Sequence, residues 1–304
     1  MSYPDENKVV CFGEVLWDIL PSGSVPGGAP MNVAYHLHKQ EKDPWLITRI
    51  GIDERGKALQ DIFSDFGVHT DYFQLDGLHE TGKVFANPNE FNEVVYDIVK
   101  PSAWDFIEWE DRFRELVENS SYFVFGSLAS RNEVSGKTLL QLLEGANNKV
   151  LDINLRAPHY NRAIVEEFLQ RADLLKLNVA ELELITGWFS DYNNMDDRVK
   201  SIGDKFKIQH IVVTMGEQGA VYYTNESVYR HAGFKVEVAD TVGSGDAFLA
   251  GLLAKLMEGA SPEKALEFAS GLGAFVATQK GACPAYTLHE LGTFLLQYTT
   301  HKFS

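Results

Sequence analysis

Cysteine is scarce in this chain, because only Cys11 and Cys283 occur among its 304 residues. They lie far apart in the sequence and fit neither a zinc-ligand spacing nor a disulfide framework. We therefore expect a reducing compartment and place the protein in the cytoplasm. Long apolar runs are missing too, since no segment approaches the roughly 18 apolar residues of a membrane-spanning helix. Glu14 and Asp18 interrupt the apolar segment near the N-terminus, so we expect no signal peptide.

Basic residues are few. The chain has 27 Lys plus Arg against 43 Asp plus Glu, a formal net charge of −16. Duplex nucleic acid and anionic membranes both require a basic surface, so we expect neither as a main partner. A small polyanionic substrate could still bind if a local positive site outweighs the repulsion from the negative net charge. Apolar residues make up 45% of the chain and charged residues 23%, which is typical of a soluble globular protein.

Low-complexity tracts, charge blocks, flexible linkers and internal repeats are also absent, so we expect one domain over residues 1–304. What is present is an alternation of short apolar runs with helix-length segments. This alternation predicts an α/β fold with a mostly parallel central sheet covered on both faces. The predicted strands are 9–12, 45–50, 122–125, 150–153, 174–177 and 211–214, and the first predicted helices are 31–40 and 54–66.

One stretch breaks the alternation. Two extended segments, 83–87 and 93–97, flank a turn at residues 88–90 and predict a β-hairpin. We interpret it as a flap over the ligand end of the sheet. A surface hairpin without a role is the alternative.

Two patterns near the C-terminus predict helices. Residues 247–254 are apolar on all sides, so that helix must be buried. The next helix begins at Ser261 and Pro262, which suit the N-cap and the first helical position. Its small residues, among them Gly271 and Gly273, indicate close approach of either another helix or a flat ligand.

Several familiar motifs fail on inspection. Residues 136–138 resemble the end of a P-loop, but Arg131 stands where the first glycine is required. A dinucleotide fingerprint after Gly243 would need glycine where Phe248 stands. His36 and His38 are two residues apart on a predicted helix and face different directions, which excludes them as a metal pair.

Residues 240–248 are more informative. Three small residues, Gly243, Ser244 and Gly245, open the buried helix, so their amides should be free at the positive end of the helix dipole. Such amides form an anion hole, and Asp246 in the first turn would lie beside the bound anion. The simpler alternative is that Asp246 is only a favourable first-turn acid, worth about 0.3–1 kcal/mol.

Short segments along the chain share one further pattern. They are GEVLWD (13–18), GGAPMNVA (27–34), DINLR (152–156), NVAE (178–181), TMGEQG (214–219) and DTVGSGDAFLAGLL (240–253). In order and spacing they resemble the ribokinase-like (PfkB) carbohydrate kinase family, with a later family glycine at Gly51. The chain departs from the family at Glu41, a position usually occupied by Gly or Ser, which we interpret as a local difference in a turn.

The resemblance implies a ribokinase-like three-layer sandwich, in which residues of about 14–30 and 81–101 form a small β lid on a single kinase domain. The lid would close over the sugar and exclude water, which competes as acceptor. Its strands would expose edges that need covering, and a homodimer formed through the lid would cover them.

The resemblance also implies catalytic roles. Asp246 would be the base that removes the proton from the sugar hydroxyl. The amides of Gly243, Ser244 and Gly245 would stabilise charge on the transferred phosphoryl group. Both tasks suit phosphoryl transfer, in which catalysis is mainly positioning plus electrostatics.

By the same resemblance, four residues form the sugar pocket. Asp18 would accept hydrogen bonds from two adjacent hydroxyls, Gly28 would let the backbone approach, and Asn32 would offer a donor and an acceptor. Arg156 would bind phosphate through its planar, charged fork. The alternative for Asp18 is a solvated acid in a turn.

The remaining implied residues bind the nucleotide and ions. Asn178 and Glu181 would organise Mg²⁺ and phosphate, the metal through water. A monovalent cation, K⁺, would lie by Asp240 and Val242. The residues implied to contact ATP are Thr214, Gly216, Gly219, Lys280 and Gly281.

The predicted function is ATP-dependent phosphorylation of a primary hydroxyl of a free sugar. The segments at 13–18 and 27–32 resemble bacterial fructokinases more than ribokinases or nucleoside kinases, so we expect D-fructose as substrate and fructose 6-phosphate as product. Kinases of ribose, 2-keto-3-deoxygluconate or a nucleoside are alternatives. Two other classes stay open, a catalytically silent sugar-binding regulator and a Rossmann-like oxidoreductase.

Overall fold

The computed structural model describes residues 5–20, 23–88, 94–189, 191–192 and 194–299. Within them, a nine-stranded sheet has the order β13-β12-β11-β10-β9-β8-β1-β4-β5. The strands from β11 to β5 are parallel, and β12 and β13 join antiparallel at one edge. Their bounds are β1 Asp5–Phe12, β4 Asp43–Gly51, β5 Phe73–Asp76, β8 Ser120–Gly126, β9 Lys149–Asp152, β10 Leu174–Asn178, β11 His210–Thr214, β12 Ala220–Thr224 and β13 Val228–His231.

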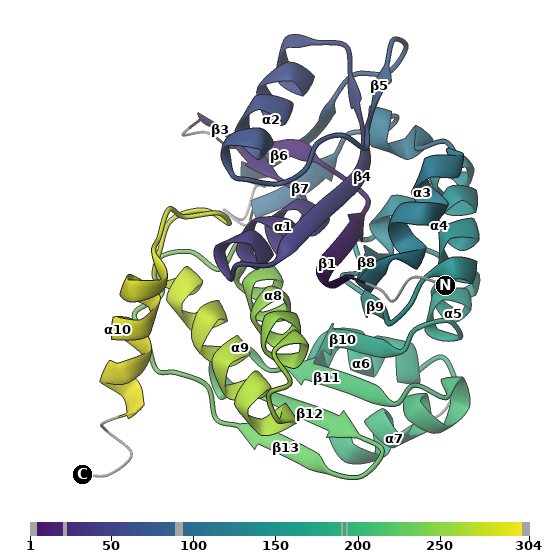
Figure 1. Cartoon of the computed structure of the whole chain (residues 1–304). Coiled ribbons are helices and arrows are strands. Elements are labelled where there is room, and N and C mark those ends of the chain that lie inside the picture. Colours follow the sequence, from purple (N-terminus) through teal and green to yellow (C-terminus); the bar gives the residue numbers. More distant parts are fainter. Residues whose placement is uncertain (1–4, 21–22, 89–93, 190, 193, 300–304) are drawn as a thin grey trace.

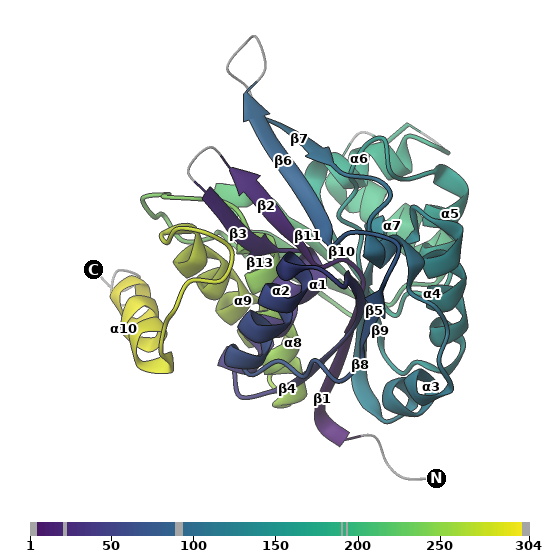
Figure 2. The same cartoon turned by 90° about the horizontal axis from the view of Figure 1, so that it is seen from above.

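Helices cover both faces of this sheet, as Figure 2 shows. On one face lie α1 Ala29–Lys39, α2 Glu54–Asp65, α8 Ser244–Met257 and α9 Pro262–Ala277, with α10 Leu288–Thr299 packed outside α9. On the other lie α3 Asp111–Glu118, α4 Glu133–Gly145, α5 Arg162–Leu169, α6 Val179–Thr186 and α7 Met195–Phe206. No helix of the described residues is both long and apolar enough to cross a membrane.

The alternation of side chains along β1 explains why the sheet needs both layers. Val9 and Cys11 belong to the core on the α1 and α8 side, whereas Val10 and Phe12 belong to the core on the α4 and α5 side. Successive side chains of a strand point to opposite faces, and all four are fully buried. A continuous apolar run is therefore the pattern of a strand covered on both sides.

The buried helix expected at 247–254 lies within α8. Its packing shows which partner, another helix or a flat ligand, approaches the small residues of α9. A Cβ at Gly273 would lie 3.0 Å from the carbonyl oxygen of Ser244, and one at Gly251 would lie 3.3 Å from Cα of Ala269. The small residues therefore let α8 and α9 pack closely. The Ser261 side chain caps α9 as expected, with Pro262 at its first position.

A second, four-stranded sheet of order β3-β2-β6-β7 stands on the first (Figures 1 and 2). Its strands are β2 Leu16–Leu20, β3 Gly23–Gly27, β6 Gly82–Pro88 and β7 Val94–Ile98. The predicted hairpin is confirmed by the antiparallel β6 and β7, while β2 pairs with β6 in parallel. Part of its predicted turn, residues 89–90, lies outside the described residues. We call this second sheet the lid sheet.

The predicted strands and the helices 31–40 and 54–66 are confirmed to within a few residues. Three short strands toward the two edges, β5, β12 and β13, escaped prediction. Glu41 has a φ of 59°, in the left-handed region that favours glycine, so its departure from the family pattern is a local feature of the turn after α1. Residues 136–138 lie inside α4, and His36 bonds to the Ala282 carbonyl and the Tyr286 hydroxyl.

Candidate active site

Side chains from several strands meet where the parallel strands end, between the central sheet and the lid sheet. In open α/β sheets ligands bind at the carboxyl ends of the strands. Here the ends of β9 and β10 face the N-terminus of α8, and α1 begins beside them. Most of the predicted site residues lie around this junction.

The N-terminus of α8 forms part of the expected anion hole. Gly243 has a φ of 76°, and a Cβ there would lie 2.5 Å from Cβ of Ala282, so only glycine fits. The amides of Gly243 and Gly245 donate to no other atom of the described residues. The amide of Ser244 was expected to be free, which is wrong, because it donates to the Thr241 carbonyl at 3.3 Å. A tight turn before α8 takes up that donor, so two of the three amides stay available.

Asp246 lies in the first turn of α8 and is held from α1. The Asn32 amide nitrogen donates to its Oδ2 at 2.8 Å, across 214 residues of sequence. The pKa of Asp246 is raised to about 6, first by burial and then by the charge of Asp152, although Lys176, Asn32 and Arg156 lower it. At neutral pH the carboxylate is therefore largely ionised, with a pKa close enough to 7 for a general base.

A buried ion pair lies beside Asp246, and sequence analysis missed it. Lys176 Nζ donates to both carboxylate oxygens of Asp152, each at 2.8 Å, and the two side chains are only 9% and 7% exposed. A Cβ at Gly245 would lie 3.5 Å from this ammonium, which is therefore in contact with the first turn of α8. Burial alone would lower the pKa of Lys176, but Asp152 and Asp246 outweigh it, so the lysine stays charged.

The signal for this pair was present in the sequence. Lys176 is a charge inside the apolar run 174–177, and such a residue needs a buried partner. Lys176 lies opposite Asp152 because β9 and β10 are neighbours and pair in that register. Strand order and register cannot be read from the sequence, so the partner could not be identified there.

Asp18 lies on β2 of the lid sheet and is half-buried. Burial raises its pKa to about 6, and the charge of Arg156 opposes that rise. A side chain at Gly27 would collide with the Asp18 carboxylate, and one at Gly28 would collide with the carbonyl of Glu14. Gly27 therefore leaves room for the Asp18 carboxylate within the lid sheet, and Gly28 lets the start of α1 approach the segment between β1 and β2. Arg156 is exposed, and the positive charge of its guanidinium lowers the pKa values of Asp18, Glu14 and Asp246.

Asn178 and Glu181 form a capping box at the start of α6. The Asn178 side chain accepts from the Glu181 amide, and the Glu181 carboxylate accepts from the amides of Asn178 and Leu155, each at 2.9 Å. Glu181 thus ties the loop after β9 to the end of β10, and both its oxygens are engaged. Among the described residues, no group of three or more His, Cys, Asp or Glu side chains is arranged to hold a metal. The expected role of this pair toward Mg²⁺ stays a prediction.

The residues expected to bind nucleotide lie on turns. Gly216 begins a 3₁₀ turn after β11 and Gly219 follows it, with φ values of 58° and 89°, and Thr214 ends that strand. Asp240 accepts from the amides of Val242 at 3.0 Å and Gly281 at 3.1 Å. The structure thus brings Asp240, Val242 and Gly281 together, next to the exposed Lys280. A cavity of about 390 Å³ is lined by Glu237, Val238, Ala239, Thr278 and Tyr298. Two of these residues, Ala239 and Thr278, lie close in the sequence to Asp240 and Lys280.

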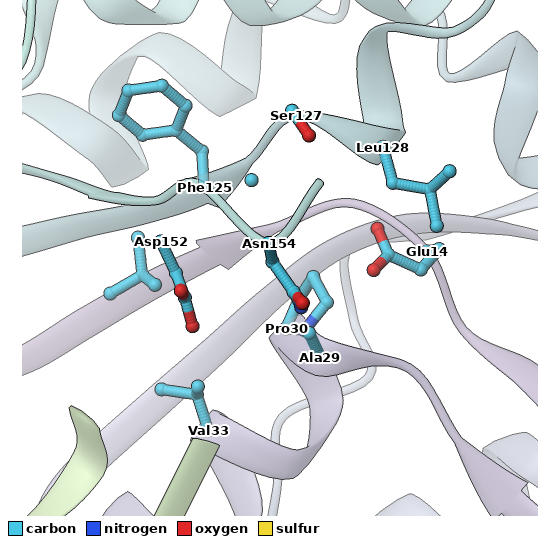
Figure 3. Close-up of a pocket in the computed structure, with 11 residues that line it drawn as sticks. Glu14, Ala29, Pro30, Val33, Phe125, Ser127, Leu128, Asp152 and Asn154 are labelled. Atoms are coloured by element: carbon cyan, nitrogen blue, oxygen red, sulfur yellow. The ribbon is translucent and has the colours of Figure 1, made fainter. Parts of the chain in front are cut away.

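A further small cavity lies at the carboxyl ends of β8 and β9 (Figure 3). Glu14, Asp152 and Asn154 line it together with Ala29 and Pro30 at the start of α1. The sequence did not assign Glu14 to the site, although it lies two residues beyond the apolar strand β1, as Asp152 ends β9. The carboxyl ends of these parallel strands meet at one edge of the sheet, which places both acids there.

Comparison with known proteins agrees with this geometry. The sequence pattern of the pfkB family carbohydrate kinases matches residues 8–288. The chain belongs to the pfkB carbohydrate kinase family. It is therefore a sugar kinase, and its fold is ribokinase-like. The fructokinase of Escherichia coli is 31% identical, with 91% of this chain and 95% of that protein covered. The probable chloroplastic fructokinase-6 of Arabidopsis thaliana is also 31% identical, with 93% and 80% covered.

Solved structures of other kinases have the same architecture. The fructokinase of Vibrio cholerae with fructose, ADP and calcium matches this kinase with a TM-score of 0.83 and 27% identity, over 96% of this chain and all of that one. The fructokinase of Xylella fastidiosa with bound ATP matches the fold with a TM-score of 0.87 at 22% identity, over 97% of this chain and all of that one. Kinases of this fold thus bind nucleotide, and one of them binds sugar and a divalent ion.

Proposed function

We propose that this kinase transfers the γ-phosphoryl group of ATP to a primary hydroxyl of D-fructose and forms fructose 6-phosphate. The observation that carries the proposal is the first turn of α8. There, two unpartnered amides adjoin a carboxylate that Asn32 holds at 2.8 Å and whose pKa is about 6. This arrangement supplies a base and an oxyanion site within one helical turn, as phosphoryl transfer requires.

In the proposed reaction Asp246 accepts the proton of the sugar hydroxyl as its oxygen attacks the γ-phosphorus. The bond between that phosphorus and the β,γ-bridging oxygen breaks, and ADP leaves with the electron pair. The Gly243 and Gly245 amides face the charge on the transferred group, and Lys176 adds a fixed positive charge beneath them. Base catalysis contributes typically about 10²–10⁴-fold, and a fixed array of donors needs no reorganisation during the reaction.

The choice of D-fructose rests on the fructokinases among the relatives and on an acidic pocket suited to hydroxyls. The Asp18 carboxylate on β2 reaches over Gly27, the last residue of β3, two residues before α1 begins. An ionised carboxylate accepts hydrogen bonds from two adjacent hydroxyls. Gly28 and Asn32 would complete the pocket, and the exposed Arg156 would bind the phosphate that enters beside it.

Mg²⁺ and K⁺ are part of the proposal. Mg²⁺ bound with ATP would neutralise phosphate charge. Because both Glu181 oxygens accept from amides, Asn178 and Glu181 suit an ion that keeps its water shell. K⁺ would lie by the loop of Asp240 and Val242, which the amide of Gly281 fixes through the Asp240 carboxylate. One related fructokinase structure contains potassium with fructose and ADP, at 26% identity.

We further propose that residues of about 14–30 and 81–101 act as a lid on the single kinase domain, excluding water from the reacting phosphate. A second copy of the chain would cover exposed edges of the lid sheet. The residues proposed to contact ATP are Thr214, Gly216, Gly219, Lys280 and Gly281. Both cysteines are free, which supports a reducing location such as the cytoplasm.

The test is coupled ADP release measured with a panel of sugars: D-fructose, D-ribose, D-glucose, 2-keto-3-deoxygluconate and a nucleoside. We expect the largest kcat/KM for D-fructose and its loss in the Asp246→Asn variant. A larger value for another acceptor would refute fructose. Sugar binding by calorimetry without ADP release from any acceptor would refute the kinase activity.

A further inference from the structure

We propose that Glu14 and Ser127 form a polar subsite that binds a hydroxyl of the sugar other than the one that is phosphorylated. This inference rests on the proposed function, because it names the contacts by which that site would recognise its acceptor. Glu14 lies between β1 and β2, and Ser127 follows the end of β8. Both line the cavity of Figure 3.

The side chain of Glu14 is buried and incompletely satisfied. The residue is 5% exposed, and its Oε2 has no hydrogen-bond partner among the described residues. The pKa of Glu14 is raised to about 7, mainly by burial and also by the charge of Asp246, although backbone hydrogen bonds and Arg156 lower it. A buried carboxyl oxygen without a partner costs stability, and a ligand that donates to it recovers that cost.

Ser127, just beyond the end of β8, shows the same feature. It is 1% exposed, and its hydroxyl oxygen also lacks a hydrogen-bond partner among the described residues. Most buried hydroxyls in folded proteins are hydrogen-bonded, so two unsatisfied polar atoms on one cavity are unusual.

The cavity adjoins the residues proposed to bind the sugar. Ala29, Pro30 and Val33 of α1 form one wall, and Asn32 of the same helix holds Asp246. Asp152, on the opposite strand end, lines the cavity and also binds Lys176. A sugar whose reactive hydroxyl lies at Asp246 therefore has this cavity next to it.

Size and charge select a hydroxyl as the occupant. The free space is about 20 Å³, which admits roughly one water-sized group and excludes a phosphate or a second ring. A carboxyl group repels anions, whereas a hydroxyl can donate to Glu14 and accept from Ser127. A single ordered water could make the same two bonds, so the experiment must separate a sugar hydroxyl from a water.

The main variant is Ser127→Ala. Its hydroxyl has no partner in the described protein, so removing it costs the fold nothing. The matched control is Ser270→Ala, because Ser270 is another buried serine with an unpartnered hydroxyl, on α9 and outside this cavity. We expect Ser127→Ala to raise the calorimetric Kd for D-fructose about tenfold. The control should leave that Kd within about twofold.

A second variant, Glu14→Met, keeps the length of the side chain and removes both acceptors. We expect it to raise the Kd for D-fructose about 30-fold or more, because a charged or strongly polar partner is lost. The KM for ATP should stay within about twofold. If the Glu14→Met variant does not fold, the Kd of the Ser127→Ala variant for D-fructose is sufficient to test the subsite.

Deoxy analogues separate the sugar from a water. With the parent enzyme, either 1-deoxy-D-fructose or 2,5-anhydro-D-mannitol should bind about tenfold more weakly than D-fructose. For the analogue that lacks the bound hydroxyl, Ser127→Ala should cause no further loss. An unchanged Kd for D-fructose in Ser127→Ala, with ADP release intact, would mean that the cavity holds only water and would overturn the subsite. Absence of ADP release with every sugar would instead overturn the proposed function.

Discussion

The two halves of the proposed active site are built by different means. Around Asp246 the site consists of buried charges, including Glu14 and the Lys176–Asp152 pair, carried by strand ends and the first turns of helices. Around Gly216 and Gly281 it consists of turns with positive φ and backbone amides near solvent. Burial raises pKa values in the first half, whereas the second half relies on backbone shape. Substitutions should therefore affect proton chemistry in one half and nucleotide affinity in the other.

The largest effect is expected for Asp246→Asn. It removes the base but keeps an oxygen that can accept from Asn32, so the fold and sugar binding should persist. We expect kcat to fall by roughly a hundredfold or more, while the calorimetric Kd for the sugar changes by less than about threefold. Unchanged turnover would remove Asp246 from the role of base.

Lys176→Met should come next. It leaves the carboxylates of Asp152 and Asp246 without their buried cation, so the pKa of Asp246 should rise. The acidic limb of kcat/KM, expected near pH 6 in the parent enzyme, should move up by about one unit. The free energy of unfolding should fall by about 3–5 kcal/mol, measured by urea denaturation. The control is Lys176→Met with Asp152→Asn, which removes one stranded charge and should recover part of both losses. An unshifted pH profile would contradict this account.

The Asp18→Ala variant separates sugar binding from proton transfer within the buried half of the site, the half around Asp246. Asp18 is proposed to orient the sugar without taking part in proton transfer, so KM for the sugar should rise about 30-fold and kcat should change little. Calorimetry of sugar binding checks the same point. If the affinity is unchanged, Asp18 is only a solvated acid of the lid sheet.

Glu14→Gln tests the cost of burying a charge. Because the folded-state pKa of Glu14 is about 7, above its ordinary value, the protonated form favours folding. Its contribution is fully present below about pH 4.5 and is lost as the pH rises through about 7. The glutamine variant should therefore match the parent near pH 4.5 and exceed its unfolding free energy by about 1–3 kcal/mol near pH 8. Equal stability at both pH values would show that Glu14 ionises without cost.

The smallest effect is expected in the exposed half. Lys280→Ala removes a charge that lies in solvent, so KM for ATP should rise only about two- to fivefold, and less at high salt. The sugar Kd should not change. A loss of kcat as large as that of Asp246→Asn would contradict the division between the two halves.

The sequence predicted those parts of the fold in which a strand or helix coincides with a continuous apolar run. Strands such as β1 and β10 are covered on both faces and stand out, whereas the edge strands β5 and β13 are short and partly exposed. For the site, turns with glycine and the acid of α8 were visible in the residues or by family resemblance. The Lys176–Asp152 pair was not, because it depends on which strands are neighbours. The Ser244 amide was misassigned because its acceptor, the Thr241 carbonyl, is made available only by the turn that precedes α8.

The lid sheet leaves the central sheet through a very short connection. Only residues 13–15 separate β1 from β2, and Glu14 is the middle one. Any swing of the lid sheet relative to the central sheet would change backbone angles there, as it would at the junctions of β3 with α1 and of β5 with β6, and Glu14 of this segment also lines the small cavity. A molecule held by Glu14 would consequently bias the angle of such a swing, so occupancy of the cavity and closure of the lid sheet would be thermodynamically linked.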